Sequence, residues 1–373
     1  MLAVAVIAVA GCTIEPILHL RKAVKTKVAL ATSVNVDVMW QVNWQANWSF
    51  NWNVATLGPV GYTIPASMRM HVFTQGPEGE TVAHYVHNFV GDQTQMEVFI
   101  GTHDLLFHNN DSEALLFKQD DEFADVHAYT RQLAKGLKAS KQILTVAQKA
   151  AMTKAEDEEE KKDTVVVDEP VNLTPDGLFS LYDKDQVITD NLDDYVFEDG
   201  RYILKIEGSL DPHTFIYLFQ IKLSNNASRV IGSAGGAALT GMAQGVDLMT
   251  GEAWEQTASY LTDVYFDKEQ DLLGARIMTF GIPGCNPLDE SSVAAAPEGA
   301  HYLVLNVSYV NGSYRNISIP VTEQIRALPT GGLITLELDV DDFPPDESAG
   351  GGGGFEALIG DWDEQTGSTT IIN

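Results

Sequence analysis

Histidine pairs are the first feature of this 373-residue chain whose residue types could support chemistry. His84 and His87 lie three residues apart in "HYVH", and His103 and His108 follow. On a strand, positions three apart face opposite sides of the sheet, and a zinc ion needs its ligands on one side. The spacing therefore predicts no metal site at these histidines.

A second candidate is the acidic stretch "DVDDFPPDE", which carries Asp339, Asp341, Asp342 and Asp346. Carboxylates at this spacing are hard oxygen ligands of the kind calcium prefers, but the glycine turn and closing glutamate of an EF-hand are missing. A solvated loop is the default interpretation. We expect no metal and no cofactor, and calcium near Asp339–Asp342 stays an open alternative.

Catalytic signatures are missing from the sequence. There is no Walker loop, no HExxH and no G-x-S-x-G, and the Gly-rich "GSAGGAALTG" has no lysine to cradle a phosphate. Cys285 in "GIPGCNP" is expected to be a small packed residue. We predict that the chain is not an enzyme and assign no catalytic residue. The alternative is a hydrolase that uses paired carboxylates.

Tryptophan recurs every fourth residue in "VMWQVNWQANWSFNWN", at Trp40, Trp44, Trp48 and Trp52. From Val34 to Val54 every even position is apolar and nearly every odd position is polar, which is the period of a strand rather than of a helix. The pattern predicts one long or kinked strand with one apolar face. Its rings either fill a β-sandwich core, which we favour because valines share their face, or form a row that stacks sugars.

The first residues resemble an export signal. Residues 1–12 are predicted to be a lipoprotein signal peptide, because Leu2–Ala10 is apolar but too short to span a bilayer and Val9–Cys12 matches the bacterial lipobox. Lipid on Cys12 would anchor the mature chain to a membrane. No Lys or Arg precedes the apolar run, so the true start codon is left open.

A basic tether follows at residues 13–33. It carries Arg21, Lys22, Lys25 and Lys27 before the predicted strand. These residues either contact anionic lipid or form a trypsin-like processing site.

The net charge of −29, from 52 acidic and 23 basic residues, excludes nucleic acid as an expected partner. Most of the acidic excess lies after residue 165. Residues 132–165 change from Lys-rich to acidic without strand alternation, and predict a charged linker, either helical or disordered.

Many short strands with turn signals predict an all-β chain of two tandem β-sandwich domains, residues 34–131 and 166–373. In the second domain "TFIYLFQIKLSN" is apolar on both faces and is expected to be central in a sheet. Asn311-Gly312 predicts a type I′ hairpin turn. Five glycines at 350–354 predict a flexible joint.

Several of these segments together resemble a known family. The lipobox at Cys12, "HVFTQGPEG", "VFIGTHDLLFHNND", "AYTR" at 128–131 and "GGGGFEALIGDWDE" are similar to an uncharacterised family of Bacteroidetes lipoproteins related to the fimbrillins, the subunits of type V pili. The resemblance implies two transthyretin-like sandwich domains, trimming after a basic residue at Arg21, Lys22, Lys25 or Lys27, and polymerisation by donor-strand exchange. Phe355–Asn373 would be the donor segment.

The expected function is that of a palmitate-bearing lipoprotein on the surface of the outer membrane, acting as a structural or adhesive fimbrial component. Its expected partners are the membrane through Cys12, a homo- or hetero-polymer of fimbrial subunits, and a glycan or host surface. The alternative is a glycan-binding lipoprotein of a saccharide-uptake system. Stalk, tip and anchor roles are not distinguished by the sequence.

Overall fold

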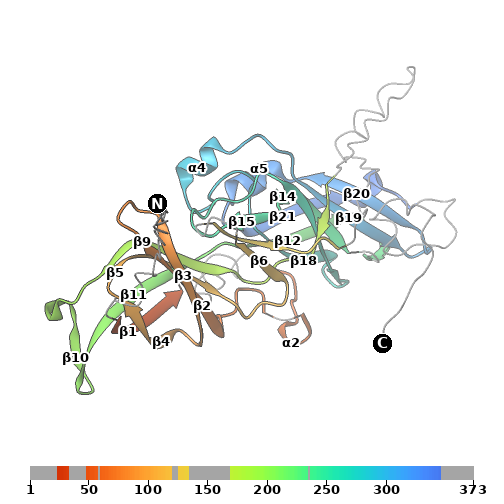
Figure 1. The fold of residues 1–373 in the computed structure, drawn as a ribbon. Helices are drawn as coiled ribbons and strands as arrows, with labels where there is room; N and C mark the ends of the chain where they lie inside the picture. Colours follow the sequence, from red (N-terminus) through yellow and green to blue (C-terminus); the bar gives the residue numbers. More distant parts are fainter. Residues whose placement is uncertain are drawn as a thin grey trace, which may run out of the picture.

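The computed structural model describes residues 23–32, 48–57, 59–119, 125–133, 169–233 and 236–345. These residues form an all-β structure in which strands of two bodies lie next to each other (Figure 1). Helices are short: α2 (Val54–Leu57), α4 (Glu290–Ala295) and α5 (Thr322–Ala327). No helix in these ranges has the length and apolar composition needed to cross a bilayer.

The first body is built from one folded sheet with the strand order β3-β2-β5-β9-β11-β1-β4, and β10 pairs with β11. Because the ladder between β9 and β11 contains two residue pairs, the sheet turns there and its two halves enclose one apolar core. The strands are β1 (Ala23–Thr32), β2 (Ser67–Gln75), β3 (Thr81–Val90), β4 (Gln93–Phe99), β5 (Gly101–Asn109), β9 (Phe179–Ile188), β10 (Val196–Glu198) and β11 (Arg201–Pro212).

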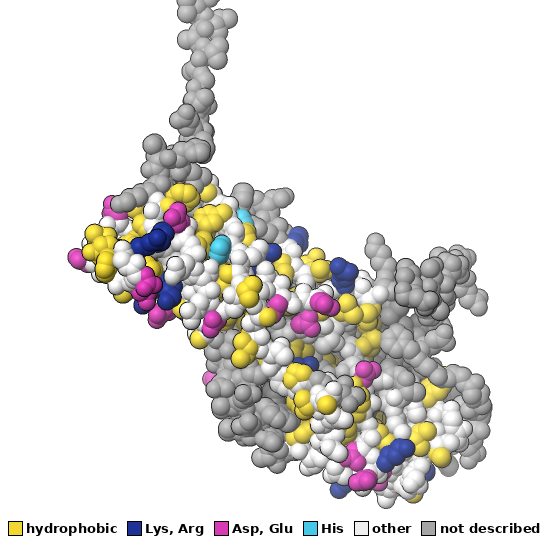
Figure 2. All heavy atoms as spheres, turned by 90° about the horizontal axis from the view of Figure 1, so that it is seen from below, with side chains coloured by type: hydrophobic (Ala, Val, Ile, Leu, Met, Phe, Trp, Pro, Cys, Tyr) yellow, Lys and Arg dark blue, Asp and Glu magenta, His cyan; other side chains and the backbone are white. Residues whose placement is uncertain are grey.

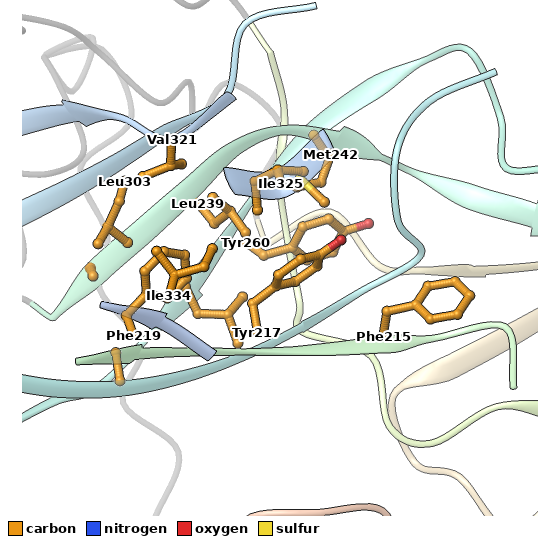
Figure 3. Close-up of a cluster of buried hydrophobic side chains, with 14 of the residues drawn as sticks. Phe215, Tyr217, Phe219, Leu239, Met242, Tyr260, Leu303, Val321, Ile325 and Ile334 are labelled. Atoms are coloured by element: carbon orange, nitrogen blue, oxygen red, sulfur yellow. The ribbon is translucent and has the colours of Figure 1, made fainter. Parts of the chain in front are cut away.

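The second body contains a sheet in the order β17-β18-β12-β21, a sheet in the order β13-β19-β14-β16-β8 with β20 beside β19, and the small sheet β15-β7-β6. Figure 3 shows side chains from several of these strands meeting in one core, among them Tyr217, Tyr260 and Leu303. The strands are β6 (Leu115–Gln119), β7 (Val126–Thr130), β8 (Val171–Asn172), β12 (Phe215–Ser224), β13 (Val230–Gly232), β14 (Ala237–Ala243), β15 (Gly245–Asp247), β16 (Thr257–Thr262), β17 (Val264–Asp267), β18 (Leu272–Thr279), β19 (Tyr302–Tyr309), β20 (Tyr314–Pro320) and β21 (Gly332–Asp339).

Strand β12 lies between the two cores and has both faces buried. Phe215, Tyr217 and Phe219 pack into the second core, whereas Ile216 and Leu218 pack into the first. This confirms the central position predicted from its apolar residues on both faces, because a strand covered on both faces needs no polar alternation.

The predicted linker at residues 132–165 does not separate the sheets. β9 and β11 come after it in the sequence, yet they complete the sheet begun by β2 and β5. The core-facing residues Phe179 and Ile206 supply part of the first core. Local sequence does not indicate which distant segments pair as strands. The composition change at residues 132–165 therefore could not show that β9 and β11 join the sheet of β2 and β5.

The hairpin of β19 and β20 forms as predicted, but its turn is of a different type. Gly312 has a positive φ of 82°, whereas Asn311 is not among the residues with positive φ. A type I′ turn needs positive φ at both residues. The Gly312 N–H donates to Tyr309 O at 3.0 Å, and the Tyr309 N–H donates to Ser313 O at 2.9 Å. This is the three-residue loop whose last residue is a left-handed glycine.

The predicted strand at Val34–Val54 is wrong for the part that the structure describes. Residues 48–53 pair with no strand and Val54 begins α2, while residues 33–47 lie outside the described ranges. Burial still alternates over residues 48–52, although no ladder forms. Phe50 is buried and Trp48 and Trp52 are half-buried, whereas Ser49 and Asn51 are exposed. The pattern therefore reports one face packed on a sheet.

Side-chain amides hold this segment where a ladder would otherwise do so. Gln220 Oε1 on β12 accepts from the N–H groups of Ser49 and Phe50, at 2.6 and 3.2 Å. Gln270 Nε2 donates to Ser49 O at 3.1 Å. The Phe50 ring lies on Gly274, where a Cβ atom would come within 2.8 Å of it.

Replacing Phe50 with Ala is expected to lower the free energy of unfolding by about 3 kcal/mol or more, as for other buried phenylalanines. Urea denaturation measures this, with the exposed neighbour Asn51→Ala as the matched control. Equal stability of the two variants would show that the Phe50 ring does not anchor the segment.

Candidate functional site

The position of β1 in the first body gives the structure its clearest functional feature. β1 lies between β11, to which it runs parallel, and β4, to which it runs antiparallel. The ladder with β11 joins Thr26–Thr32 to Leu204–Leu210, and the ladder with β4 joins Ala23–Ala29 to Gln93–Phe99. Without β1, both neighbours would present unpaired backbone groups, as edge strands do.

Alternate side chains of β1 fill the core between these neighbours. Thr26 and Val28 are fully buried and Leu30 is 4 % exposed. Val24 packs on the same core from its margin. Lys25 and Ala31 point to solvent. β1 thus pairs on both edges and contributes one face to the core. The slot that it occupies offers what β-augmentation needs, namely backbone pairing for affinity and pockets for alternate side chains.

Two of the predicted processing residues lie within this strand. Lys25 is exposed, and Lys27 is half-buried with its Nζ 3.7 Å from Glu198 Oε2. Both are in ladder register with β4. A protease must bind its substrate in an extended, accessible form, so neither bond can be cut while β1 stays in the sheet. Arg21, Lys22 and the lipidation candidate Cys12 lie outside the described residues.

The histidines occupy two faces of the first sheet, as predicted for the pair His84 and His87. His87 Nε2 lies 3.0 Å from Thr94 Oγ1, whereas the ring of His84 stacks on Phe73 at 4.5 Å. No group of three or more His, Cys, Asp or Glu in the described ranges has metal-site geometry.

A row of three contacting histidines was not predicted from the sequence. His71 on β2 reaches His84 on β3 through Nδ1 at 3.0 Å, and His108 on β5 through Nε2 at 3.1 Å. His108 Nδ1 lies 2.8 Å from Asn109 O. Burial and the neighbouring His108 lower the pKa of His71 to about 3, and burial lowers the pKa of His108 to about 4. The period-two alternation of "MRMHVF" was the available signal, but the cross-strand neighbours of His71 could not be read from it.

Asp339 and Asp341 of the acidic stretch form hydrogen bonds and an ion pair with other residues of the protein. Asp339 caps the short helix η4 (Val340–Asp342) by accepting from the Asp341 N–H at 3.0 Å. Asp339 Oδ2 accepts from Asn225 Nδ2 at 2.9 Å, and Asp341 forms an ion pair with Arg229 at 2.6 Å. Asp346 lies outside the described residues. These contacts give Asp339 and Asp341 structural roles.

Cys285 is fully buried and its Sγ donates to Ile282 O. Burial raises the pKa of this thiol to about 11. A thiol that stays protonated is not a nucleophile, which agrees with the predicted packing role.

The described tryptophans of the predicted row do not form an open platform. Trp48 and Trp52 pack against the first core and meet each other edge to face, with ring centroids 6.1 Å apart. Trp52 also contacts Tyr265 at 5.5 Å. Trp40 and Trp44 lie outside the described ranges.

The hairpin of β10 and β11 carries exposed aromatic side chains. Phe197 is 64 % exposed and Tyr202 is 49 % exposed, and their rings contact each other at 5.1 Å. Asp199 and Gly200 both have positive φ, which fits a type I′ turn that the dipeptide Asp-Gly could have predicted. Hydrophobic side chains are visible at the end of the molecule that carries this hairpin (left in Figures 1 and 2).

Fold and site together define an all-β protein whose first described strand fills a slot between two others. The chain belongs to the family described as "Domain of unknown function (DUF5119)", whose model matches residues 45–263, more than half of the sequence. No curated protein matches it.

Solved structures from Bacteroidetes are similar to the chain at TM-scores below 0.5. A Bacteroides ovatus protein described as a "putative adhesin" has 14% identity and a TM-score of 0.47, with 89% of this chain and 98% of that chain covered. The fimbrial anchor protein Mfa2 from Porphyromonas gingivalis has 8% identity and a TM-score of 0.41, with 85% and 91% covered. A fimbrial assembly protein from Parabacteroides distasonis has 10% identity and a TM-score of 0.33, with 85% and 91% covered.

Proposed function

We propose that the protein is a cell-surface lipoprotein of the outer membrane that serves as a structural or adhesive fimbrial component and is assembled by strand exchange at the β1 slot. The observation that carries this proposal is the placement of β1 between β11 and β4, with alternate side chains in the core. Lipid on Cys12 would tether the chain to the membrane.

The β1 strand has the topology needed for exchange. It runs parallel to β11, and β2 and β3 come between β1 and β4 in the sequence, so no tight hairpin ties it to either neighbour. It can leave without unthreading any other strand. The slot it leaves would have two strand edges and apolar pockets, which a strand from another subunit can fill.

Processing at the four basic residues would affect β1 in two different ways. A cut after Arg21 or Lys22 would keep the whole strand on the mature chain. A cut after Lys27 would remove Val24 and Thr26 and leave Val28–Thr32, which is a shorter and more easily displaced strand. Because Lys25 and Lys27 are held in the sheet, we propose that trimming starts at Arg21 or Lys22, and that cutting at the two lysines requires β1 to leave first.

A variant that begins at Ser33 tests the proposal, because it lacks β1. It is expected to bind synthetic peptides with the sequences Ala23–Thr32 and Phe355–Asn373, and to form chains at high concentration. The variant that begins at Ala23 keeps β1 and is expected to do neither. Calorimetry and size-exclusion chromatography measure these outcomes. A Ser33 variant that is folded and monomeric and ignores both peptides would disprove strand exchange.

A further inference from the structure

A polar crevice lies where the two bodies meet. It has a volume of about 290 Å³ and is bounded by the segment from Leu57 to Pro65, by the loop after β5, by the residues before β9 and by β18. Its polar lining includes Arg276, Asp176, Asp111 and Ser112. Junctions between domains are places where small-molecule sites are often found.

Arg276 supplies hydrogen-bond donors to this crevice. Its Nε donates to Val60 O at 2.8 Å and its Nη2 to Gly61 O at 3.3 Å, which fixes the plane of the guanidinium. Nη1 has no hydrogen-bond partner within the described ranges, and no carboxylate there forms an ion pair with Arg276. Burial lowers the pKa of this guanidinium, and Tyr62 and Asp176 act in the opposite direction. The crevice thus contains a positioned cation with N–H groups to spare.

Asp176 supplies an acceptor to the same space. Its Oδ2 accepts from Ser112 Oγ at 2.7 Å and from the N–H groups of Glu113 and Ala114 at 3.2 Å. These bonds hold the carboxylate in one orientation. In the part of the chain that the structure describes, Oδ1 has no hydrogen-bond donor. Asp111 is held similarly, with Oδ2 accepting from the Ala66 N–H at 2.6 Å.

The mixture of charges restricts the ligand. Two carboxylates line the crevice together with the guanidinium. In a chain of net charge −29 they disfavour an anionic ligand, and the guanidinium disfavours a cation. A hydroxyl group satisfies both, since it accepts from Arg276 and donates to Asp176. A small ring with several hydroxyls matches a donor and an acceptor that line one crevice from different elements.

We infer that this crevice binds a neutral saccharide residue, with Arg276 Nη1 donating to one hydroxyl and Asp176 Oδ1 accepting from another. The inference deepens the adhesive part of the proposed function, because it names the class of ligand and the site. It uses residues remote from the β1 ladder in sequence, so its failure would leave strand exchange standing.

Saturation-transfer NMR on the full chain tests this inference, with methyl glycosides of glucose, galactose, mannose, fucose and N-acetylglucosamine as neutral probes and N-acetylneuraminic acid as the acidic one. At least one neutral glycoside is expected to bind, and the acidic sugar is not. Asp176→Asn is expected to weaken binding about tenfold or more. The amide oxygen of Asn can still accept from Ser112, but the amide NH2 group then faces the crevice and cannot accept from a sugar hydroxyl.

Two control variants make the result decisive. Asp289→Asn changes an exposed helix cap elsewhere and is expected to bind as the unmodified chain does. Trp254→Ala removes a half-buried ring that stacks on Tyr129 at 5.9 Å and offers the competing stacking surface. The inference is overturned if no neutral glycoside binds, if Asp176→Asn binds as tightly as the unmodified chain, or if only Trp254→Ala abolishes binding.

Discussion

Val28→Asp is expected to lower the free energy of unfolding by about 4 kcal/mol or more. The substitution removes a fully buried apolar side chain, worth ~1.5–3 kcal/mol, and places an unpaired carboxylate in the first core, at a further cost of several kcal/mol. Release of β1 is the expected response to this burial, because no tight hairpin joins β1 to β4 or β11. The expected product is a chain whose first body is intact but whose slot is open.

Limited trypsin digestion reports this release separately from global unfolding. In the unmodified chain Lys25 and Lys27 are protected by the ladders with β4 and β11. In Val28→Asp, cleavage after both lysines is expected to be faster than cleavage within the cores. Ala31→Asp puts the same carboxylate on the exposed face of β1 and is expected to change neither stability nor cleavage. Equal digestion of the two variants would mean that β1 cannot leave independently.

The second large effect is a loss of stability in acid. The folded-state pKa is about 3 for His71 and about 4 for His108, whereas an unfolded histidine titrates near 6.5. Above pH 6.5 both states are neutral and the difference has no effect. Below it the unfolded chain binds protons that the fold excludes, so stability falls by about 1.4 kcal/mol per pH unit for each such histidine until the folded pKa is reached. His213, whose pKa burial lowers to about 4, adds to the slope.

Urea denaturation between pH 7 and pH 4 measures this slope, and His71→Phe is expected to reduce it. NMR titration provides the direct check. The ring resonances of His71 and His108 are expected to keep their neutral positions down to pH 5. Titration of either ring near pH 6.5 in the folded protein would contradict the buried arrangement.

Local sequence patterns predicted the features that depend on one segment. The apolar residues on both faces of β12 predicted a strand that is central in a sheet, and the strand faces two cores. The spacing of His84 and His87 predicted opposite faces of β3, since side chains of a strand alternate.

Features that depend on distant segments could not be predicted in this way. The ladder of β1 joins residues 26–32 to residues 204–210, and no local property of either segment specifies that pairing. The alternation at residues 48–52 matched one buried face, but side-chain hydrogen bonds from Gln220 and Gln270 replace the expected ladder. The crevice around Arg276 and Asp176 likewise arises where separate segments meet.

Hydrogen–deuterium exchange of the β4 and β11 amides tests the central claim most directly. In the unmodified chain, the amides of Gln93–Phe99 and Leu204–Leu210 that face β1 are expected to be protected. In the variant that begins at Ser33 they are expected to exchange fast, and to regain protection when the peptide Phe355–Asn373 is added. Protection that persists without β1, or fast exchange that the peptide leaves unchanged, would contradict the account of β1 as a strand that another subunit can replace.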